Sequence, residues 1–170
     1  MSDESTSEPE GEGSAAAGQG HVLLERLYLK DASFESPRSP AVFAEAWRPE
    51  FQLEVNTRAS SVGDERVEVV LSTTLRAKTE GGKTAYIVEI QQAGVFQVSG
   101  LEASARQRVL GTLCPGTLFP YVRETVDNLV VKGGFPAVHL APVNFEALYA
   151  DALRKQASQV QAPGGNTRTH

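Results

Sequence analysis

Two alternating runs joined by a pair of glycines constrain the fold more than any other feature of this chain. In residues 66–78, apolar or small side chains occupy one set of alternate positions, and charged or hydroxyl side chains occupy most of the other set. The alternation resumes in residues 84–98, after Gly81 and Gly82. A period of two indicates a β-strand with one buried face, and a short turn between two such strands implies antiparallel pairing.

Each run also predicts which side chains share a face. In the first run the buried set is expected to be Val67, Val69, Leu71, Thr73, Leu75 and Ala77. In the second run one face is formed by Tyr86, Val88, Ile90 and Gln92, and the opposite face by Ile87, Glu89 and Gln91. Two further strands are predicted at residues 21–34, where a change of phase indicates a bulge, and at residues 51–55.

After these strands the apolar spacing becomes helical. Residues 101–113 favour a helix, residues 114–116 are expected to interrupt it, and residues 118–131 resume it with Pro120 in the first turn. Asn144 is a suitable N-cap for a last helix. Strands followed by helices indicate an α+β domain. We therefore predict a four-stranded antiparallel, Greek-key-like sheet followed by two main helices.

The formal net charge of −5 resides in the first twenty residues. Residues 1–20 contain five acidic side chains and no basic one, whereas the remaining 16 of the 21 acids are balanced by 16 bases. Residues 1–20 also lack large apolar side chains after Met1, so we predict a disordered acidic tail. The Pro-Gly-Gly sequence within residues 159–170 predicts a flexible C-terminal tail, which leaves residues 21–158 as the folded domain.

Composition disfavours several classes of protein. A body without net charge or a Lys/Arg cluster argues against nucleic-acid binding. The sequence has neither an apolar run long enough to insert in a membrane nor the basic and apolar start of a secretory signal. With a single cysteine, Cys114, no internal disulfide can form, which fits a reducing compartment. We therefore expect a cytoplasmic protein.

The known sequence patterns of catalytic and metal sites are missing. Gly82, Lys83 and Thr84 resemble the end of a phosphate-binding loop, but Ala77 stands where that loop needs a glycine. The histidines and the single cysteine are not spaced to converge on a metal ion. We expect no enzymatic activity, no cofactor and no metal.

Apolar side chains are unusually frequent in two predicted loops. Phe43, Ala46 and Trp47 lie between prolines before the second strand, and the loop before the last helix contains Phe135, Val138, Leu140 and Val143. Loops are normally polar surface. Either these loops pack on the core, or they form a hydrophobic groove or an oligomer interface.

Four segments resemble the SecB family of bacterial protein-export chaperones, in family order and at family spacing. They are YLKDASFESP (28–37), EIQQAGVF (89–96), LCPGTLFPYVRETV (113–126) and LAPVNFEALY (140–149), within a match from about residue 26 to residue 156. The resemblance implies a cytoplasmic homotetramer, a dimer of dimers. It also implies a holdase that keeps newly made preproteins unfolded, uses no nucleotide and delivers them to the translocation ATPase SecA.

The resemblance also assigns roles to residues. It implies a SecA-binding patch of Asp31, Glu35, Ile87 and Glu89, and an assembly or client face of Tyr86, Val88, Ile90 and Gln92. The two apolar loops correspond to the grooves of the family, which makes Phe43, Trp47, Phe135, Val138 and Leu140 the client-groove candidates. The C-terminal tail departs from the family pattern because it contains no acidic residue, which puts a tail contact with SecA in doubt.

Two other functions remain open at this point. A SecB-like chaperone dedicated to one client, such as a toxin–antitoxin pair, would share the fold and groove. A small-molecule-binding or hydrolytic α+β enzyme would need a convergent polar constellation in a closed pocket, and the sequence shows neither.

Overall fold

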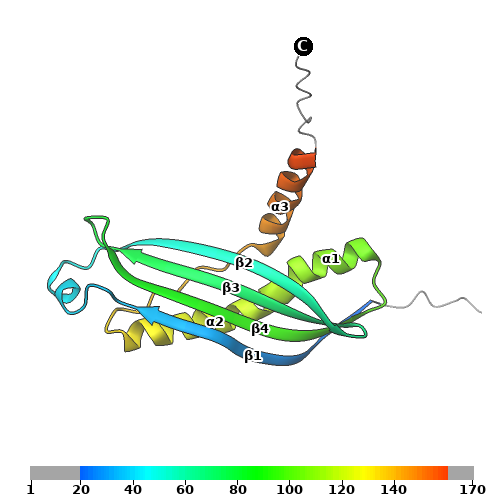
Figure 1. Ribbon diagram of the computed structural model, residues 1–170, viewed down its shortest axis with the longest axis horizontal. Coiled ribbons are helices and arrows are strands. Elements are labelled where there is room, and N and C mark those ends of the chain that lie inside the picture. Colours follow the sequence, from blue (N-terminus) through cyan, green and yellow to red (C-terminus); the bar gives the residue numbers. More distant parts are fainter. Residues whose placement is uncertain (1–19, 161–170) are drawn as a thin grey trace, which may run out of the picture.

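The computed structural model describes residues 20–160, which are built around a four-stranded antiparallel sheet, as predicted (Figure 1). The strands are β1 (His21–Glu35), β2 (Glu50–Gly63), β3 (Arg66–Lys78) and β4 (Thr84–Ser99), in the spatial order β1-β4-β3-β2. Three consecutive strands are joined by hairpins, and β1 lies beside the last of them. This is a Greek-key arrangement, and residues 36–49, the crossover loop, make its long connection.

The two edge strands differ from the sequence prediction in different ways. β1 contains the predicted irregularity, with register shifts between Leu24 and Arg26 and between Leu29 and Asp31. β2 continues well beyond the predicted residues 51–55, because pairing with β3 keeps its polar second half extended. The sequence Asn-Thr-Arg-Ala-Ser-Ser shows no apolar alternation, so this half of the strand was not recognisable from its pattern.

One face of the sheet forms the core, and the predicted alternation in its two central strands is confirmed. The buried side chains include the predicted sets: Val67, Val69, Leu71, Thr73, Leu75 and Ala77 from β3, and Tyr86, Val88, Ile90 and Gln92 from β4. The Gln92 amide is satisfied by donating a hydrogen bond to the Tyr28 carbonyl at 2.9 Å. Gly94 allows close packing at this face, since a Cβ there would lie 3.1 Å from Leu118.

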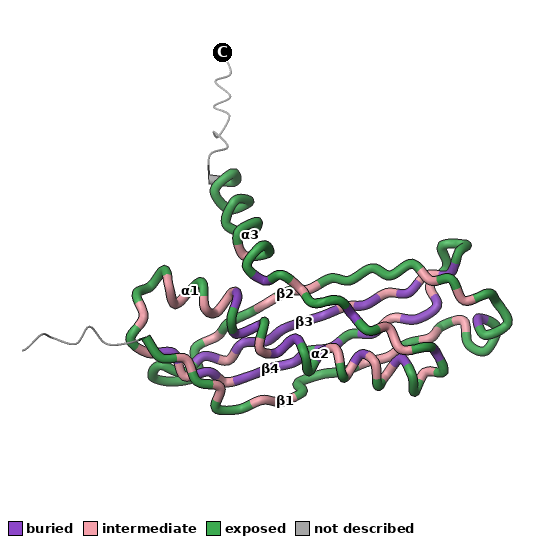
Figure 2. The backbone as a smooth tube through the Cα atoms, turned by 180° about the vertical axis from the view of Figure 1, so that it is seen from behind, coloured by how far each residue is buried: buried purple, intermediate pink, exposed green. Residues whose placement is uncertain are grey.

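The core face is covered by the longest of three helices, as Figure 2 shows from the helix side. The helices are α1 (Ala103–Gly111), α2 (Leu113–Lys132) and α3 (Phe145–Val160). α2 turns a stripe at four-residue spacing toward the sheet, and this stripe is fully buried: Leu118, Val122, Val126 and Val130.

Two predictions about α2 were wrong. The helical path breaks at Thr112, whose φ and ψ are −128° and −68°, and not at residues 114–116. Pro115 falls in the first turn, where a backbone N–H would have no helical acceptor, so it is compatible with the helix. Pro120 lies in the helix interior instead of the first turn, and it leaves the carbonyl of Gly116 without its usual donor.

α3 projects away from the sheet (Figure 1). Asn144 caps it as predicted, because its Oδ1 accepts the Ala147 N–H at 3.0 Å. The helix runs to Val160 and so includes the first two residues assigned to the C-terminal tail. The other residues of both predicted tails, 1–19 and 161–170, lie outside the described part of the chain. None of the helices within residues 20–160 is long and apolar enough to cross a membrane.

Candidate functional site

Five rings from distant parts of the sequence form an aromatic cluster: Phe34, Phe43, Trp47, Tyr86 and Phe135. Phe135 lies at its centre, with ring centroids 4.8 Å from Tyr86, 5.1 Å from Phe43 and 5.1 Å from Trp47. These separations are typical of favourable aromatic pairs. The structure therefore brings the two apolar loops of the sequence together at one end of the sheet.

Exposure changes steadily across the aromatic cluster. Phe135 and Tyr86 are buried, Trp47 is half-buried, and Phe43 is 51% exposed. The Tyr86 hydroxyl is buried without a hydrogen-bond partner in the described structure, and this burial, with a smaller effect of the Asp127 charge, raises its pKa. Some of the rings therefore complete the core, whereas Phe43 leaves apolar surface exposed.

The other two client-groove candidates lie in the helix-connecting loop, residues 133–144. Val138 is half-buried and Leu140 is buried. The loop is fastened to α2 by Asp127, whose Oδ1 accepts the N–H groups of Val138 at 3.0 Å and His139 at 3.1 Å. The loop is thus held in place by a side chain of a core helix. Because Leu140 is buried within this loop, it contributes to packing as well as being a candidate contact.

An open groove of about 510 Å³ lies between β2 and the helices α1 and α3. Its apolar lining includes Val55, Leu110, Leu148, Tyr149 and Leu153. The last three recur at helical spacing in the sequence after Asn144, but they were not predicted to line a groove. The signal that was missed is the apolar face of α3. Beyond the first turn of the helix, none of its described residues is buried.

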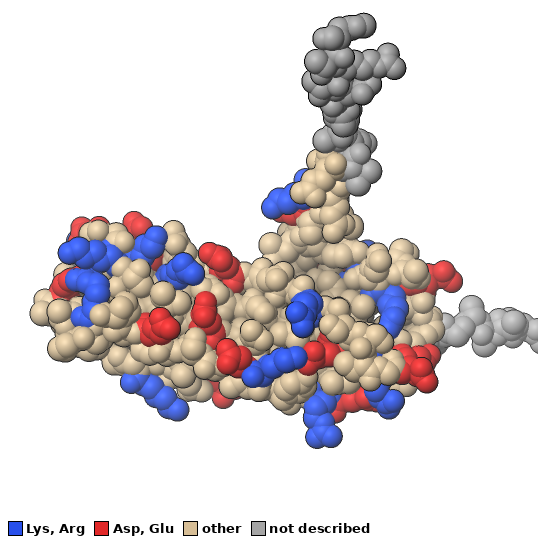
Figure 3. All heavy atoms as spheres, viewed as in Figure 1, with Lys and Arg blue, Asp and Glu red and all other residues tan. Residues whose placement is uncertain are grey.

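The predicted SecA-binding residues lie together on the face of the sheet opposite α2. Glu35 is the cross-strand partner of Ile87, and Asp31 is opposite Gln91, two positions along from the Ser33–Glu89 pair. The three acidic side chains are exposed and Ile87 is half-buried. Figure 3 views the molecule from this side, where acidic and basic side chains are interspersed.

Lys30 does not neutralise the neighbouring Asp31, because it turns toward β3. Its Nζ lies 2.8 Å from Glu68 Oε1, and the Tyr28 hydroxyl donates to the same oxygen. The hydrogen bonds from Lys30 and Tyr28 hold the pKa of Glu68 below its usual value. The carboxylate in turn raises the pKa of Tyr28 to about 12. This internal pairing leaves Asp31 available to a partner.

The four residues assigned to an assembly or client face are packed inside the subunit. Tyr86, Val88, Ile90 and Gln92 are buried in the core between the sheet and α2, with Tyr86 also part of the aromatic cluster. In the single chain they contribute to stability, and Tyr86 supports the rings that reach the surface.

The described residues offer little for catalysis. No group of three or more His, Cys, Asp or Glu side chains among residues 20–160 is arranged to hold a metal ion. Cys114 is buried, and burial raises the pKa of its thiol to about 12, so it is protonated and a weak nucleophile at neutral pH. A graded aromatic surface, an apolar groove and a charged sheet face define a protein-binding α+β module.

Comparison with known proteins agrees with that class. The family model described as "Preprotein translocase subunit SecB" matches residues 15–156. The curated "Protein-export protein SecB" of Marinobacter nauticus is 49% identical over 93% of this chain and 95% of its own length. That of Hahella chejuensis is 50% identical over 89% of this chain and 95% of its own length. This chain belongs to the SecB family, a family of protein-export chaperones and not of enzymes.

A solved structure supports the same fold. It is the SecB-like chaperone Rv1957 of Mycobacterium tuberculosis, in complex with a ChAD peptide from the Rv1956 HigA1 antitoxin. The TM-score is 0.60 at 19% identity, over 72% of this chain and 91% of the other. At this identity the likeness concerns the fold alone.

Proposed function

We propose that this chain acts as a cytoplasmic holdase, which binds preproteins before they fold and keeps them competent for translocation. An unfolded client exposes apolar and aromatic side chains, and their burial against an apolar surface is favourable at roughly 25 cal/mol per Å². A protein that binds only the unfolded state opposes folding by mass action, without nucleotide. The half-exposed Phe43, which packs on Phe135 as Trp47 does, is the observation that carries this proposal.

The client surface in this proposal consists of the aromatic cluster and the groove beneath α3. Each presents apolar side chains that can accept many sequences, because burial of apolar area does not depend on a particular order of residues. Several weak sites on one assembly raise the effective concentration of client segments at each other. A long client can therefore bind tightly although each contact is weak.

Delivery of the client to SecA is assigned to Asp31, Glu35, Ile87 and Glu89. Their acidic side chains are exposed on one sheet face, and this is the arrangement expected for docking to a basic partner surface. Ile87 adds an apolar centre to the patch.

The proposed assembly is a homotetramer, a dimer of dimers. β1 is a long edge strand with unpaired backbone groups, which is suited to pairing with a second copy. α2 exposes Leu113, Tyr121 and Val131 on the side away from the sheet. Such exposed apolar side chains on a core helix favour a second layer of protein.

A refolding assay tests the holdase proposal. A slow-folding preprotein is diluted from denaturant with or without the purified protein, in the absence of nucleotide. We expect refolding to be delayed in proportion to the concentration of chaperone. Refolding at the unassisted rate would contradict the proposal.

The identity of about 50% to curated export proteins favours general export over one dedicated client. Two preproteins of unrelated sequence distinguish these functions. A general chaperone delays both, whereas a dedicated one delays neither or only its own client.

A further inference from the structure

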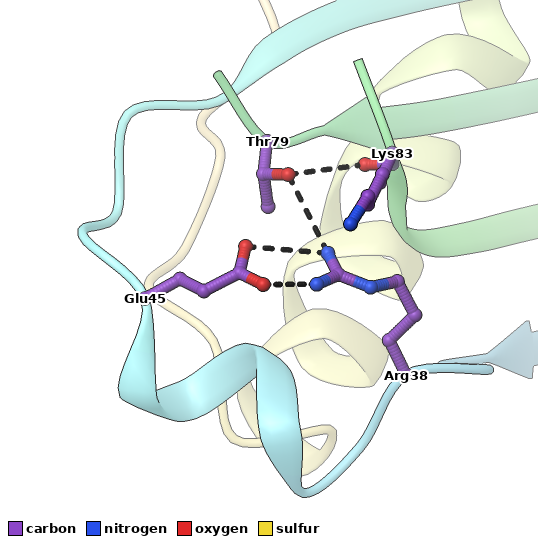
Figure 4. Close-up of polar contacts among 4 residues, drawn as sticks. All are labelled: Arg38, Glu45, Thr79 and Lys83. Carbon is purple, nitrogen blue, oxygen red and sulfur yellow. Dashed lines mark hydrogen bonds and ion pairs between the residues drawn. The ribbon is translucent and has the colours of Figure 1, made fainter. Parts of the chain in front are cut away.

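The crossover loop contains an ion pair that brackets its 3-10 helix, η1 (Ala41–Ala44) (Figure 4). Arg38 precedes the helix and Glu45 follows it. Arg38 Nη1 lies 3.2 Å from Glu45 Oε2, and Nη2 contacts Oε1. A guanidinium that meets a carboxylate with two nitrogens fixes orientation as well as distance. The pair therefore closes the loop around η1.

The Arg38–Glu45 ion pair is also attached to the sheet. Arg38 Nη1 lies 3.5 Å from the hydroxyl of Thr79, a buried residue in the turn between β3 and β4 (Figure 4). The Thr79 N–H donates to the Lys83 carbonyl at 2.9 Å, so its position is set by that turn. At the start of the loop, the Ser36 hydroxyl donates to the Ala85 carbonyl at 3.1 Å.

The segment between Arg38 and Glu45 determines where two rings of the aromatic cluster lie. Val42 is buried in the core while the next residue, Phe43, is 51% exposed above Phe135. Trp47 follows Glu45 by two residues and packs on both Phe135 and Tyr86. A change in the path between residues 38 and 45 would therefore move both Phe43 and Trp47.

The surrounding charges keep both members of the Arg38–Glu45 ion pair ionised. The hydrogen bond from Arg38 holds the pKa of Glu45 below its usual value, with a smaller contribution from the nearby charge of Lys83. Glu45 is thus a carboxylate at neutral pH. Neither Arg38 nor Glu45 is among the residues that the family resemblance singles out.

We propose that Arg38 and Glu45 are positioning residues, which hold Phe43 and Trp47 in the arrangement that binds apolar client segments. The proposal rests on the holdase function and adds a determinant of its affinity. Aromatic side chains that are already ordered lose less conformational freedom when a client binds. Breaking the ion pair should weaken binding without removing any side chain that touches the client.

The test combines tryptophan fluorescence with client affinity. Trp47 is the only tryptophan of the chain, so its emission reports directly on the packing of the crossover loop. Arg38→Glu breaks the pair by repulsion, and Glu45→Gln breaks it by neutralisation. Arg38→Lys retains the charge. Arg66→Glu is the matched control, because it breaks a similar ion pair of 2.7 Å with Glu25, which joins β3 to β1.

We expect Arg38→Glu and Glu45→Gln to shift Trp47 emission to the red and to increase its quenching by acrylamide. Their dissociation constant for reduced, carboxymethylated lactalbumin, which stays unfolded, should rise about three- to tenfold. Arg66→Glu should stay within about twofold of the wild type. Arg38→Lys keeps the charge but not the two-nitrogen contact, so its loss should be smaller than that of Arg38→Glu.

Three results would overturn the proposal: unchanged Trp47 quenching in both pair-breaking variants, unchanged client affinity in both, or an equal loss in Arg66→Glu. A wild-type protein that binds no client would instead reject the holdase function. In that case the quenching data alone decide whether the ion pair positions Trp47.

Discussion

Glu35 and Ile87 face each other across the β1–β4 ladder, although 52 positions separate them in the sequence. This pairing places two family motifs, one from each strand, on a single exposed surface with Asp31 and Glu89 nearby. The register between β1 and β4 therefore brings the residues of this patch together. Any change that shifts the bulge between Leu29 and Asp31 would turn Asp31 away from it.

The acidic patch should be separable from client binding. Replacing Asp31 and Glu89 by Lys is expected to weaken SecA binding by at least about tenfold at low salt, because each change substitutes repulsion for attraction. Delay of client refolding should not change, since both side chains lie on the face opposite the core. Binding of labelled SecA is the measurement.

The double variant Glu80→Lys, Glu102→Lys is the control for net charge, since both side chains are exposed outside the four patch residues and the charge changes by the same amount. Unchanged SecA affinity in the Asp31→Lys, Glu89→Lys variant would reject the patch. An equal loss in the Glu80→Lys, Glu102→Lys variant would show that total charge, and not this patch, governs docking.

Phe43 and Leu140 should respond differently to truncation. Phe43→Ala removes a half-exposed ring, so client affinity is expected to fall about fivefold with little loss of stability. Leu140→Ala empties a buried site and should lower the free energy of unfolding by about 2–5 kcal/mol. Urea unfolding and client titration of both variants measure the two effects. A Phe43→Ala protein that binds clients like the wild type would show that the ring only packs.

The exposed side of α2 should control assembly. Replacing Tyr121 and Val131 by Glu introduces charge where we propose that a second layer of protein packs, so light scattering should report a species smaller than the proposed tetramer. Ala103→Glu with Ser104→Glu, on the exposed surface of α1, adds the same two negative charges and should leave the mass unchanged. A Tyr121→Glu, Val131→Glu variant with the mass of the wild type would place the interface elsewhere.

The Tyr28–Glu68–Lys30 contact should make stability depend on pH at both extremes. The pKa of Glu68 is lowered in the folded state, so its contribution is present above the ordinary value of 4.5 and is lost as pH falls through the lowered value. The pKa of Tyr28 is raised to about 12, so its contribution is complete below 10 and is lost as pH rises through about 12.

Urea unfolding from acid to alkaline pH measures this dependence. Glu68→Gln should be less stable than the wild type at pH 7, and the difference should shrink below pH 4.5. Tyr28→Phe should flatten the alkaline limb near 12. A constant difference at all pH values would mean that the loss comes from packing.

The central part of the fold was predictable because its sequence pattern is local. Alternation in β3 and β4 required only that one face be buried, and their side chains are buried as expected. The second half of β2 was not predictable, since cross-strand pairing and not its own composition keeps it extended. The helix break at Thr112 was misplaced because Pro115 is tolerated in a first turn.

The candidate site was predictable only in part. The two apolar loops were visible in the sequence, but their meeting at Phe135 depends on the crossover from β1 to β2 and on the end of α2. The resemblance supplied the residues predicted to bind SecA, and the strand register brings these residues together on one face. The Arg38–Glu45 pair had no sequence signal, because two opposite charges seven residues apart in a loop are common by chance.

The graded exposure of the aromatic cluster has a kinetic consequence. Phe43 has an exposed ring surface while its neighbours are held in place. If clients bind there as we propose, the first contact would require no prior opening of the protein, and association would proceed at the rate of diffusional encounter. The rate of association would then compete with the rate at which a client first collapses. The lifetime of each complex would determine how long that client stays unfolded.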